Sequence, residues 1–427
     1  MSDWQQVSLG VLETPVCRTA AVPPQGPTAS VGDGYPLRPL GEMMHLDIQR
    51  TPMKPATTYR LAGVLNAGKG VVAKGELDGG DTEYAAMNVL RADQVVMRKL
   101  TAWEGPITVV PAEFDGFVVS NEFPTFTLGP ELLPAWMRHV CGSPRLWAEM
   151  KNRVSGTVQR RKRLNPEQLL QIQLPIPPRD VQVRIAEMLD AVDDQIAALH
   201  AESAALEGLL ESLRSDLLET DHQPISDVLL GIDSGKSVQA GGEASAEDEY
   251  RILKLSAVQC GWFKPSEAKT ITEVAVFSPG HVVKNGDLLI TRANTPERVG
   301  FVAIARNVPE GTFMPDLIWR LRVDESRVCT GYLEHALSSR ELRTSISGTA
   351  GGTSKSMVKI NKRGFGTVRV PIPSLPEQGE YVQRCDAVAE GIRATRAEEA
   401  RLRQARSGLL SGLLDRTIEI ESAELGV

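Results

Sequence analysis

Two long segments carry the same heptad pattern, and each is too long for a helix inside one compact domain. In residues 179–220 apolar side chains recur three and four positions apart, with no internal proline, at Ile185, Leu189, Val192, Ile196, Leu199, Leu206, Leu210, Leu213 and Leu217. The repeat predicts a coiled-coil helix about 60 Å long, at about 1.5 Å per residue. A helix of this length needs an equally long partner.

The expected partner is the segment 375–418, whose pattern coincides with the first when 196 is added to each residue number. Its seam consists of Tyr381, Cys385, Val388, Ile392, Thr395, Leu402, Leu409 and Leu413. Because Thr395 and Glu399 make this seam less apolar, we expect docking on the first helix to stabilise it. The alternative is two separate amphipathic helices, each on its own domain, but the shared register and the length favour a pair.

Similar offsets appear outside the helices, so the whole chain has the pattern of an internal duplication with a period near 190 residues. Leu174-Pro175-Ile176-Pro177 before the first helix corresponds to Val370-Pro371-Ile372-Pro373 before the second, and residues 154–157 correspond to 346–349. Each half should contain short strands and turns, with one short helix over 134–150 or 332–345. The expected fold class is α+β, with two mixed α/β domains, each followed by a long helix, and the helices pairing as an antiparallel coiled coil.

The 427 residues are enough for two or three domains. The expected organisation is an N-terminal extension or linker (1–36), a first globular domain (37–178), a first long helix (179–220), a second globular domain (221–374), a second long helix (375–418) and a C-terminal tail (419–427).

Composition narrows the class of protein. No run of eighteen apolar residues occurs, and the first thirty residues lack both a basic region and a continuous apolar region, so we expect neither a membrane-spanning helix nor an export signal. The five cysteines are odd in number and scattered and form no CxxC pair, which argues against a disulfide framework and a zinc site. A reducing cytoplasm is the expected location.

The net charge of −7 does not exclude DNA binding, because it is unevenly distributed. Residues 179–220 carry a charge of −7 and residues 377–419 a charge of −1, so the rest of the chain sums to +1. The isoelectric point therefore reflects mainly one acidic helix.

Signatures of catalysis are missing from the sequence. The glycine-rich residues 348–356 resemble a phosphate-binding loop, but Ser354 stands before Lys355 where such a loop has glycine. There is no GxSxG, HExxH or dinucleotide-binding motif, and no Asn/Asp-Pro-Pro-Tyr/Phe loop of an amino-methyltransferase. We expect no catalytic residue, cofactor or metal in this chain.

Basic runs fall at matching points of the two halves. Residues 151–163 contain six Lys/Arg and residues 351–369 contain five, with no acidic residue in either run. Polar side chains alternate with the charges, as expected where a loop contacts DNA phosphates and base edges. For a single run a solvated loop would be the favoured explanation, but two runs at matching positions of the repeat favour DNA contact.

The chain resembles the DNA-specificity subunit of type I restriction-modification systems over nearly its entire length from about residue 37. The stretches typical of that family's target-recognition domains are Ala102–Gly105, Gly286–Asn294, Gly352–Ile360 and Pro371–Gln378. One departure is Arg179-Asp180-Val181-Gln182, where the family usually has Leu-x-Glu-Gln. The candidate DNA-binding residues are Lys151, Arg153, Gln159, Arg160, Arg161, Lys162, Arg163, Arg292, Asn294, Ser354, Lys355, Lys359, Lys362 and Arg363.

The resemblance implies that each globular half reads one part of a bipartite double-stranded DNA sequence and that the helix pair fixes their spacing. It implies a non-catalytic subunit that recruits two adenine-methyltransferase subunits and, through them, restriction/translocase subunits; S-adenosylmethionine, ATP and magnesium then belong to these partners. Three alternatives stay open: a subunit of a modification-only or phage-defence complex, a fused methyltransferase or nuclease, and a coiled-coil scaffold that does not bind DNA.

Overall fold

The computed structural model describes residues 35–155, 162–216, 221–238, 241–245, 249–272, 274–351, 357–415 and 417–418. They form two compact units: one contains the described residues up to Leu189 and those from Ser407, and the other contains Asp190–Arg406. The division crosses the two long helices, α4 (Arg179–Ser215) and α8 (Leu375–Leu414), so each unit holds a part of both.

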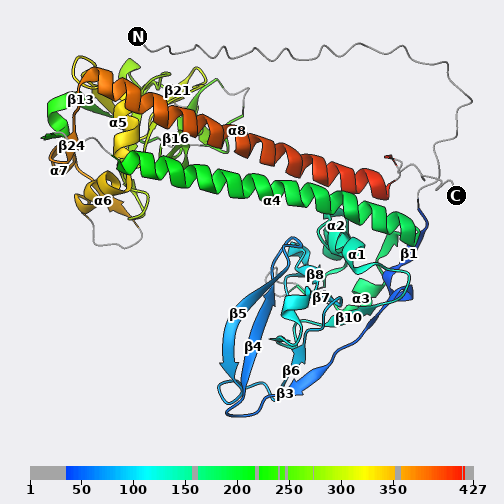
Figure 1. The fold of residues 1–427 in the computed structure, drawn as a ribbon. Coiled ribbons are helices and arrows are strands. Elements are labelled where there is room, and N and C mark those ends of the chain that lie inside the picture. Colours follow the sequence, from blue (N-terminus) through cyan, green and yellow to red (C-terminus); the bar gives the residue numbers. More distant parts are fainter. Residues whose placement is uncertain are drawn as a thin grey trace, which may run out of the picture. The chain divides into compact units, whose positions relative to one another are not determined.

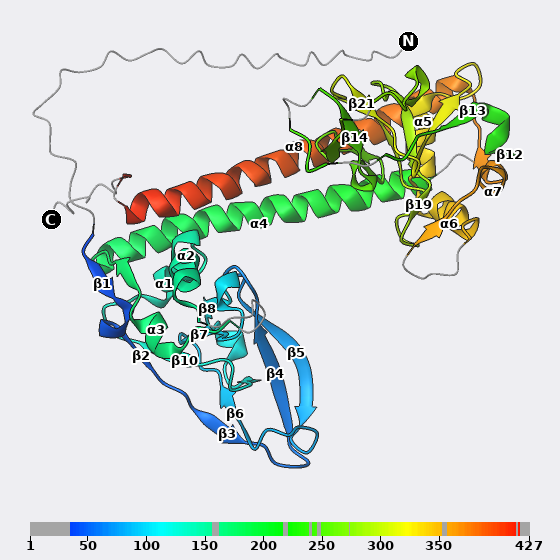
Figure 2. The ribbon, with the colours of Figure 1, turned by 180° about the vertical axis from the view of Figure 1, so that it is seen from behind.

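The first unit contains three sheets. The strands are β1 (Leu37–Pro39), β2 (Met44–Leu46), β3 (Arg50–Pro52), β4 (Thr58–Val64), β5 (Val71–Asp78), β6 (Ala86–Val89), β7 (Val95–Met97), β8 (Ile107–Val109), β9 (Val118–Val119), β10 (Thr125–Leu128) and β11 (Gln173–Pro175). The orders are β1-β11, β2-β10-β7-β8 and β3-β6-β9-β4-β5. Figure 2 shows the β4–β5 hairpin at the edge of the five-stranded sheet.

The second unit contains one four-stranded sheet and four smaller ones. Its strands are β12 (His222–Pro224), β13 (Leu229–Ser234), β14 (Arg251–Leu253), β15 (Val258–Gln259), β16 (Trp262–Phe263), β17 (Ala268–Thr270), β18 (Leu288–Thr291), β19 (Ala293–Asn294), β20 (Val302–Ile304), β21 (Thr312–Phe313), β22 (Ile318–Val323), β23 (Val358–Lys359) and β24 (Arg369–Pro371). They pair as β12-β24, β13-β22-β18-β20, β17-β14-β21, β15-β16 and β19-β23.

The two units share a frame, which confirms the duplication predicted from the sequence. The antiparallel pair β1-β11 corresponds to β12-β24, and the order β2-β10-β7-β8 corresponds to β13-β22-β18-β20. The helices α1 (Pro134–Cys141), α2 (Pro144–Arg153) and α3 (Pro166–Leu170) correspond to α5 (Thr330–Leu337), α6 (Arg340–Gly348) and α7 (Lys362–Gly366). Outside this frame the units differ: the first adds the five-stranded sheet, and the second adds small sheets built around β14 and β15.

The prediction of one short helix in each half, over 134–150 and 332–345, is wrong: each place holds two helices, which meet at a serine. The side chains of Ser143 and Ser339 each accept a hydrogen bond from the backbone N–H three residues ahead and so begin the second helix. The apolar spacing continues across both breaks, and for this reason periodicity alone does not reveal them.

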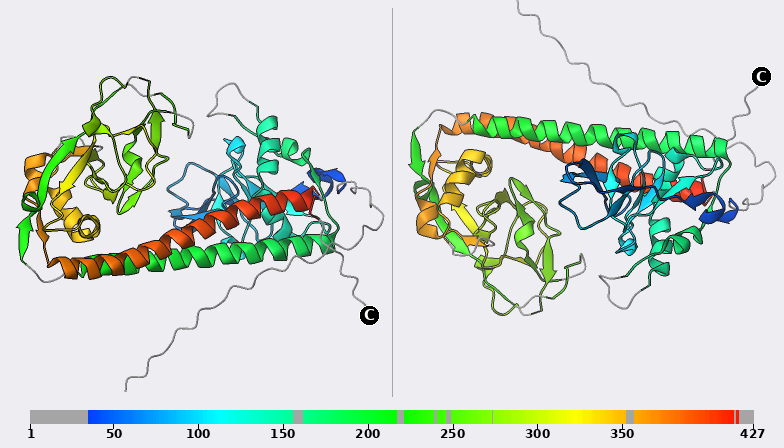
Figure 3. Two further views of the ribbon diagram at one scale, coloured as in Figure 1. Left: turned by 90° about the horizontal axis from the view of Figure 1, so that it is seen from above. Right: turned by 90° about the horizontal axis from the view of Figure 1, so that it is seen from below.

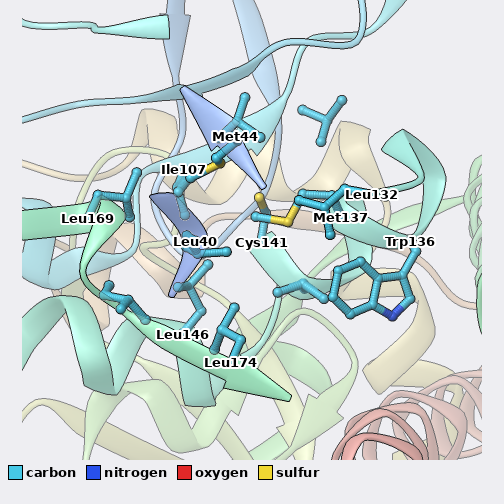
Figure 4. Packing of buried hydrophobic residues seen from close by; sticks show 14 of the residues in the cluster. Leu40, Met44, Ile107, Leu132, Trp136, Met137, Cys141, Leu146, Leu169 and Leu174 are labelled. Carbon is cyan, nitrogen blue, oxygen red and sulfur yellow. The ribbon is translucent and has the colours of Figure 1, made fainter. Parts of the chain in front are cut away.

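The core of the first unit joins the frame to the long helices. Figure 4 shows Trp136, Met137 and Cys141 of α1 packed with side chains from the neighbouring strands and helices. The same cluster includes Leu40, Met44, Ile107, Leu132, Leu146, Leu169 and Leu174, together with Ile185 and Leu189 of α4 and Leu410 and Leu413 of α8. The long helices are thus part of the core.

The helices α4 and α8 pack antiparallel, as predicted. In the first unit the beginning of α4 packs against the end of α8, whereas in the second unit Leu206 and Leu210 of α4 share a core with Tyr381 and Cys385 of α8. Figures 1 and 3 show the helices side by side within each unit. None of the helices in the described residues is long and apolar enough to span a membrane. The fold class expected from the sequence is confirmed.

The part of the seam in the second unit has a polar centre. Ser203, Thr395 and Glu399 are buried there, at 3%, 8% and 5% exposure, in positions that an ordinary seam gives to apolar residues. Ion pairs join the two helices on both sides of it: Arg396 pairs with Glu207 at 2.6 Å, and Arg406 pairs with Asp193 at 2.7 Å. Buried polar groups weaken a coiled coil but favour one register over others.

Two buried glutamines anchor the starts of the long helices in the same way. The Gln182 side chain accepts from the backbone N–H of Leu133 and donates to the carbonyls of Glu131 and Pro177, at 2.9, 2.9 and 3.0 Å. The Gln378 side chain makes the same three hydrogen bonds with the residues 196 positions further along, Cys329, Arg327 and Pro373. The departure of residues 179–182 from the family pattern therefore leaves the start of α4 unchanged.

Replacing Gln378 with alanine should lower the free energy of unfolding by about 2–4 kcal/mol, because three backbone groups lose a partner whose side chain is fully buried. Gln182→Ala should have a similar effect, since its contacts are the same. Urea unfolding, compared with Gln383→Ala at an exposed position of α8, measures the difference. A loss no larger than that of the control would mean that these backbone groups find other partners.

Candidate nucleic-acid interface

The two basic runs leave the shared frame through equivalent pairs of backbone hydrogen bonds. In the first unit Ser155 and Arg163 exchange N–H···O bonds of 2.9 and 3.0 Å, and in the second Gly351 and Lys359 do the same at 2.9 and 3.0 Å. Adding 196 to the first pair of numbers gives the second. The same two-residue bridge therefore lies within each basic run, at the end of the first and at the beginning of the second.

Five of the fourteen candidate residues lie outside the described residues. They belong to the centres of the two runs and are Gln159, Arg160, Arg161, Ser354 and Lys355. The other nine are described, and the structure places them on α2, on the two bridges and on the elements next to them.

In the first unit the structure distinguishes free cations from paired ones. Lys151 on α2 is exposed, and no ion pair with another described residue is seen for it. Arg153 pairs with Glu149 one turn earlier, and Arg163 pairs with Glu122 at 3.0 Å. The Lys162 carbonyl accepts from the N–H of Thr101, which ties the end of the run to the frame.

In the second unit the fold brings together candidates that are far apart in the sequence. Strand β19, which contains Asn294, pairs antiparallel with β23, so Lys359 lies opposite Ala293. The Ile360 N–H donates to the Arg292 carbonyl at 2.9 Å and continues this contact. The sequence motif around Asn294 and the second basic run therefore form one surface.

Arg292 has a different role from the other candidates. Its guanidinium lies over the ring of Trp319 at 5.7 Å, and its Nε is buried without a hydrogen-bond partner among the described residues. In the first unit Arg98, which follows β7 as Arg292 follows β18, is held by Asn66, Thr101 and Glu104 at 2.7–3.1 Å. Both guanidinium groups contact residues of their own unit, so these arginines are suited to a structural role beside the basic runs.

Lys362 and Arg363 begin α7 and are exposed. The Lys362 ammonium donates to the Ile232 carbonyl at 2.6 Å, so this residue already has a structural contact. No ion pair with another described residue is seen for Lys359 or Arg363, and both remain available to an anion.

The structure also reveals polar residues that the sequence analysis missed. Asn294 lines a cavity together with Gln259 and Arg298, which come from other parts of the second unit. Neither residue lies in a basic run or a recognisable motif, and only the fold brings them next to Asn294.

Comparisons with known proteins agree on one family. The sequence model described as type I restriction modification DNA specificity domain matches residues 148–208. The specificity subunit of the type I restriction enzyme EcoEI of Escherichia coli is 22% identical over 189 residues, which are 42% of this chain and 32% of that protein. The matches span 32%, 63% and 50% of three curated relatives, less than two thirds of each.

Solved structures share the fold at low sequence identity. A chain from a structure on complex assembly and conformational transition of the type I R-M system has a TM-score of 0.56 and 18% identity, and the match covers 92% of this chain and all of that one. The type I restriction-modification S subunit from M. genitalium has a TM-score of 0.52 and 13% identity, with 89% and 96% covered. The matching domain model and the named relatives show that part of the chain is similar to type I restriction-modification specificity subunits, and the solved structures show that it shares their fold.

Proposed function

We propose that this chain is the non-catalytic specificity subunit of a type I restriction-modification complex and reads a bipartite DNA target. The observation that carries the proposal is the duplicated frame, in which two basic runs leave the two units through equivalent bridges. A chain that reads two separate half-sequences needs two such surfaces, one for each half.

The division of labour follows from the chemistry of the two kinds of contact. Lys and Arg side chains of the runs contact phosphates and position the protein, whereas side chains that reach base edges determine the sequence. In this proposal residues 37–178 form the first target-recognition domain and residues 221–374 the second. The DNA-binding residues are the fourteen candidates, of which Lys151, Lys359 and Arg363 are exposed and show neither an ion pair nor a side-chain hydrogen bond among the described residues.

The helix pair sets the distance between the two half-sequences. An antiparallel pair of equivalent helices, each joined to one copy of the duplicated frame, suits a protein that reads paired half-sites, as DNA-reading dimers do. A rod of about 60 Å corresponds to between one and two turns of DNA, at about 34–36 Å per turn.

The same duplication suits a subunit that recruits two copies of an adenine methyltransferase and, through them, restriction/translocase subunits. The exposed acidic side chains of α4 and the outer surfaces of both helices are the proposed docking surfaces. S-adenosylmethionine, ATP and magnesium are bound by those partners in this proposal, and the complex acts on DNA in the cytoplasm. A modification-only or phage-defence complex would use the same subunit with fewer or other partners.

Selection from a library of random duplexes tests the proposal. The full-length chain, alone and with its methyltransferase subunits, should enrich two short defined half-sequences separated by a spacer of fixed length and free composition. Binding should weaken steeply as the salt concentration rises, because phosphate contacts release counterions. If the complex assembles but enriches no sequence and binds DNA no better than an acidic control protein, the chain is a scaffold.

A further inference from the structure

The second unit contains a cavity of about 540 Å³ beside the strand that carries Asn294. Its walls come from the segments around β14 and β15, from the turn that follows β19 and from residues 315–317. The polar residues of these walls are Ser237, Lys254, Ser256, Gln259, Lys269, Asn294, Arg298 and Asp316.

The composition of the walls fits the edges of DNA bases better than it fits phosphate alone. Asn and Gln amides match adenine, an Arg guanidinium matches guanine, and a carboxylate accepts from the cytosine amino group. Gln259, Asn294, Arg298 and Asp316 supply all of these groups around one cavity. A surface that binds only phosphates needs no carboxylate, which would repel them.

The Asn294 side chain and the Arg298 backbone are held in place, while the donor groups of both side chains stay available. The Asn294 Oδ1 accepts from the Thr295 N–H at 2.9 Å, so the amide NH₂ faces away from that bond and has no acceptor among the described residues. The Arg298 backbone is fixed, since its carbonyl accepts from the Thr291 hydroxyl at 2.9 Å and its N–H donates to the Thr295 carbonyl at 3.0 Å. Its side chain is exposed and makes no ion pair with a described carboxylate.

The other cations of the cavity differ in how much charge they offer. Lys254 pairs with Glu243 and Glu267, and a hydrogen bond from Ser256 lowers the pKa of Glu267, so this lysine is neutralised locally. Lys269 is exposed, and no ion pair is seen for it among the described residues. Arg298 and Lys269 are therefore the cations that remain for DNA.

The position of the cavity supports the same role. On one side β19 pairs with β23 (Val358–Lys359), a strand within the second basic run. On the other side lie β14 and β15, which belong to the part of the second unit that has no counterpart in the first. Because the two half-sequences differ, the surface that reads the second one should lie where the second unit differs from the first. Surfaces that both units share are suited to contacts that both units make with DNA.

We infer that this cavity reads base edges of the second half-sequence, with Asn294 and Arg298 as specificity-determining residues and Lys269 as a phosphate contact. The inference rests on the proposed function, because it assigns the base contacts of one recognition domain. Asn294 hydrogen-bonds a base edge through its free amide, and Arg298 binds the two acceptors of a guanine through its guanidinium.

The test compares the sequences that the wild-type complex and its variants select from a random duplex library. Asn294→Ala and Arg298→Ala should each relax the preference at one or two positions of a single half-sequence by roughly 5- to 100-fold. The other half-sequence and the spacer length should stay unchanged. Arg298→Lys should relax the same position while the salt dependence stays as in the wild type, since it keeps the charge and loses the two-pronged contact.

Arg340→Ala is the matched control, because Arg340 is exposed on α6 and does not line the cavity. A midpoint temperature of thermal unfolding equal to that of the wild type shows that a variant is folded. If the wild type selects a bipartite sequence and both Asn294 and Arg298 variants select the same bases with the same preference, the inference is wrong and the proposed function stands. If the wild type selects no sequence, the proposed function itself fails. Uniform weakening at every position would make these residues phosphate contacts and would also overturn the inference.

Discussion

Removing residues 193–206 from α4 together with residues 393–406 from α8 should shorten the selected spacer by up to about six base pairs. Each deletion takes out two heptads, so each helix becomes about 21 Å shorter. Base pairs follow one another at about 3.4 Å, and this sets the size of the expected change. Binding to the original target should be lost, while the two half-sequences stay the same.

These segments are chosen because they face each other in the second unit. Asp193 contacts Arg406 at 2.7 Å and His200 contacts Glu399 at 3.5 Å, so the two stretches cover the same length of the pair. Removing whole heptads keeps the remaining apolar positions in phase on both helices. The polar centre formed by Ser203, Thr395 and Glu399 leaves with them, so the shorter seam is more apolar.

Successive base pairs also turn around the DNA axis, about ten to a turn, so the shorter protein meets its second half-sequence on another side of the duplex. We therefore expect weaker binding to the best new target than the wild type has for its own. Deleting one heptad from each helix is the graded control and should change the spacer by about half as much. Helical circular dichroism and urea unfolding establish that the pair still forms. An unchanged spacer in a folded, DNA-binding complex would mean that the helices do not set the distance.

Features that depend on periodic or repeated residues could be predicted from the sequence. The heptad pattern gave the antiparallel pair because burial of a seam follows directly from the spacing of apolar side chains. The offset of 196 predicted equivalent helix starts, and the equal contacts of Gln182 and Gln378 bear this out even though the residues around Gln182 differ from the family pattern.

Features that depend on long-range pairing could not be predicted in this way. The cavity beside Asn294 collects residues between 237 and 317, and no local pattern links Gln259 to Arg298. The breaks at Ser143 and Ser339 were missed because a serine inside an apolar repeat is compatible with a continuing helix until its side chain caps the next one. The net charge of a segment was also a poor guide to its DNA-binding residues, because it does not show which cations already form ion pairs. Arg163, for example, pairs with Glu122.

Neutralising the two basic runs separately should weaken DNA binding in two distinguishable ways. One variant replaces Arg160, Arg161, Lys162 and Arg163 with alanine, and the other replaces Lys355, Lys359, Lys362 and Arg363. Each lost phosphate contact reduces the slope of log affinity against log salt by about 0.9, so four contacts account for up to about 3.6. Each variant should lose protection of its own half-sequence only, because the runs leave separate units of the duplicated frame.

Affinity for the full target is measured over a salt series, and footprinting reports each half-sequence. The control is the double variant Arg384→Ala/Arg401→Ala, which removes exposed positive charge from α8 and leaves both runs intact. The control should keep the wild-type slope of log affinity against log salt. If any loss of positive charge weakened DNA binding, the affinities of the control and of both run variants would fall alike. Some residues of the larger variants also have structural contacts, since Lys362 donates to the Ile232 carbonyl and Arg163 pairs with Glu122. A third variant therefore changes only Lys359 and Arg363, the two described cations of the second run without such contacts. If this variant and both larger ones bind DNA with the wild-type affinity and slope while the complex assembles, the basic runs are solvated surface and the DNA contacts lie elsewhere.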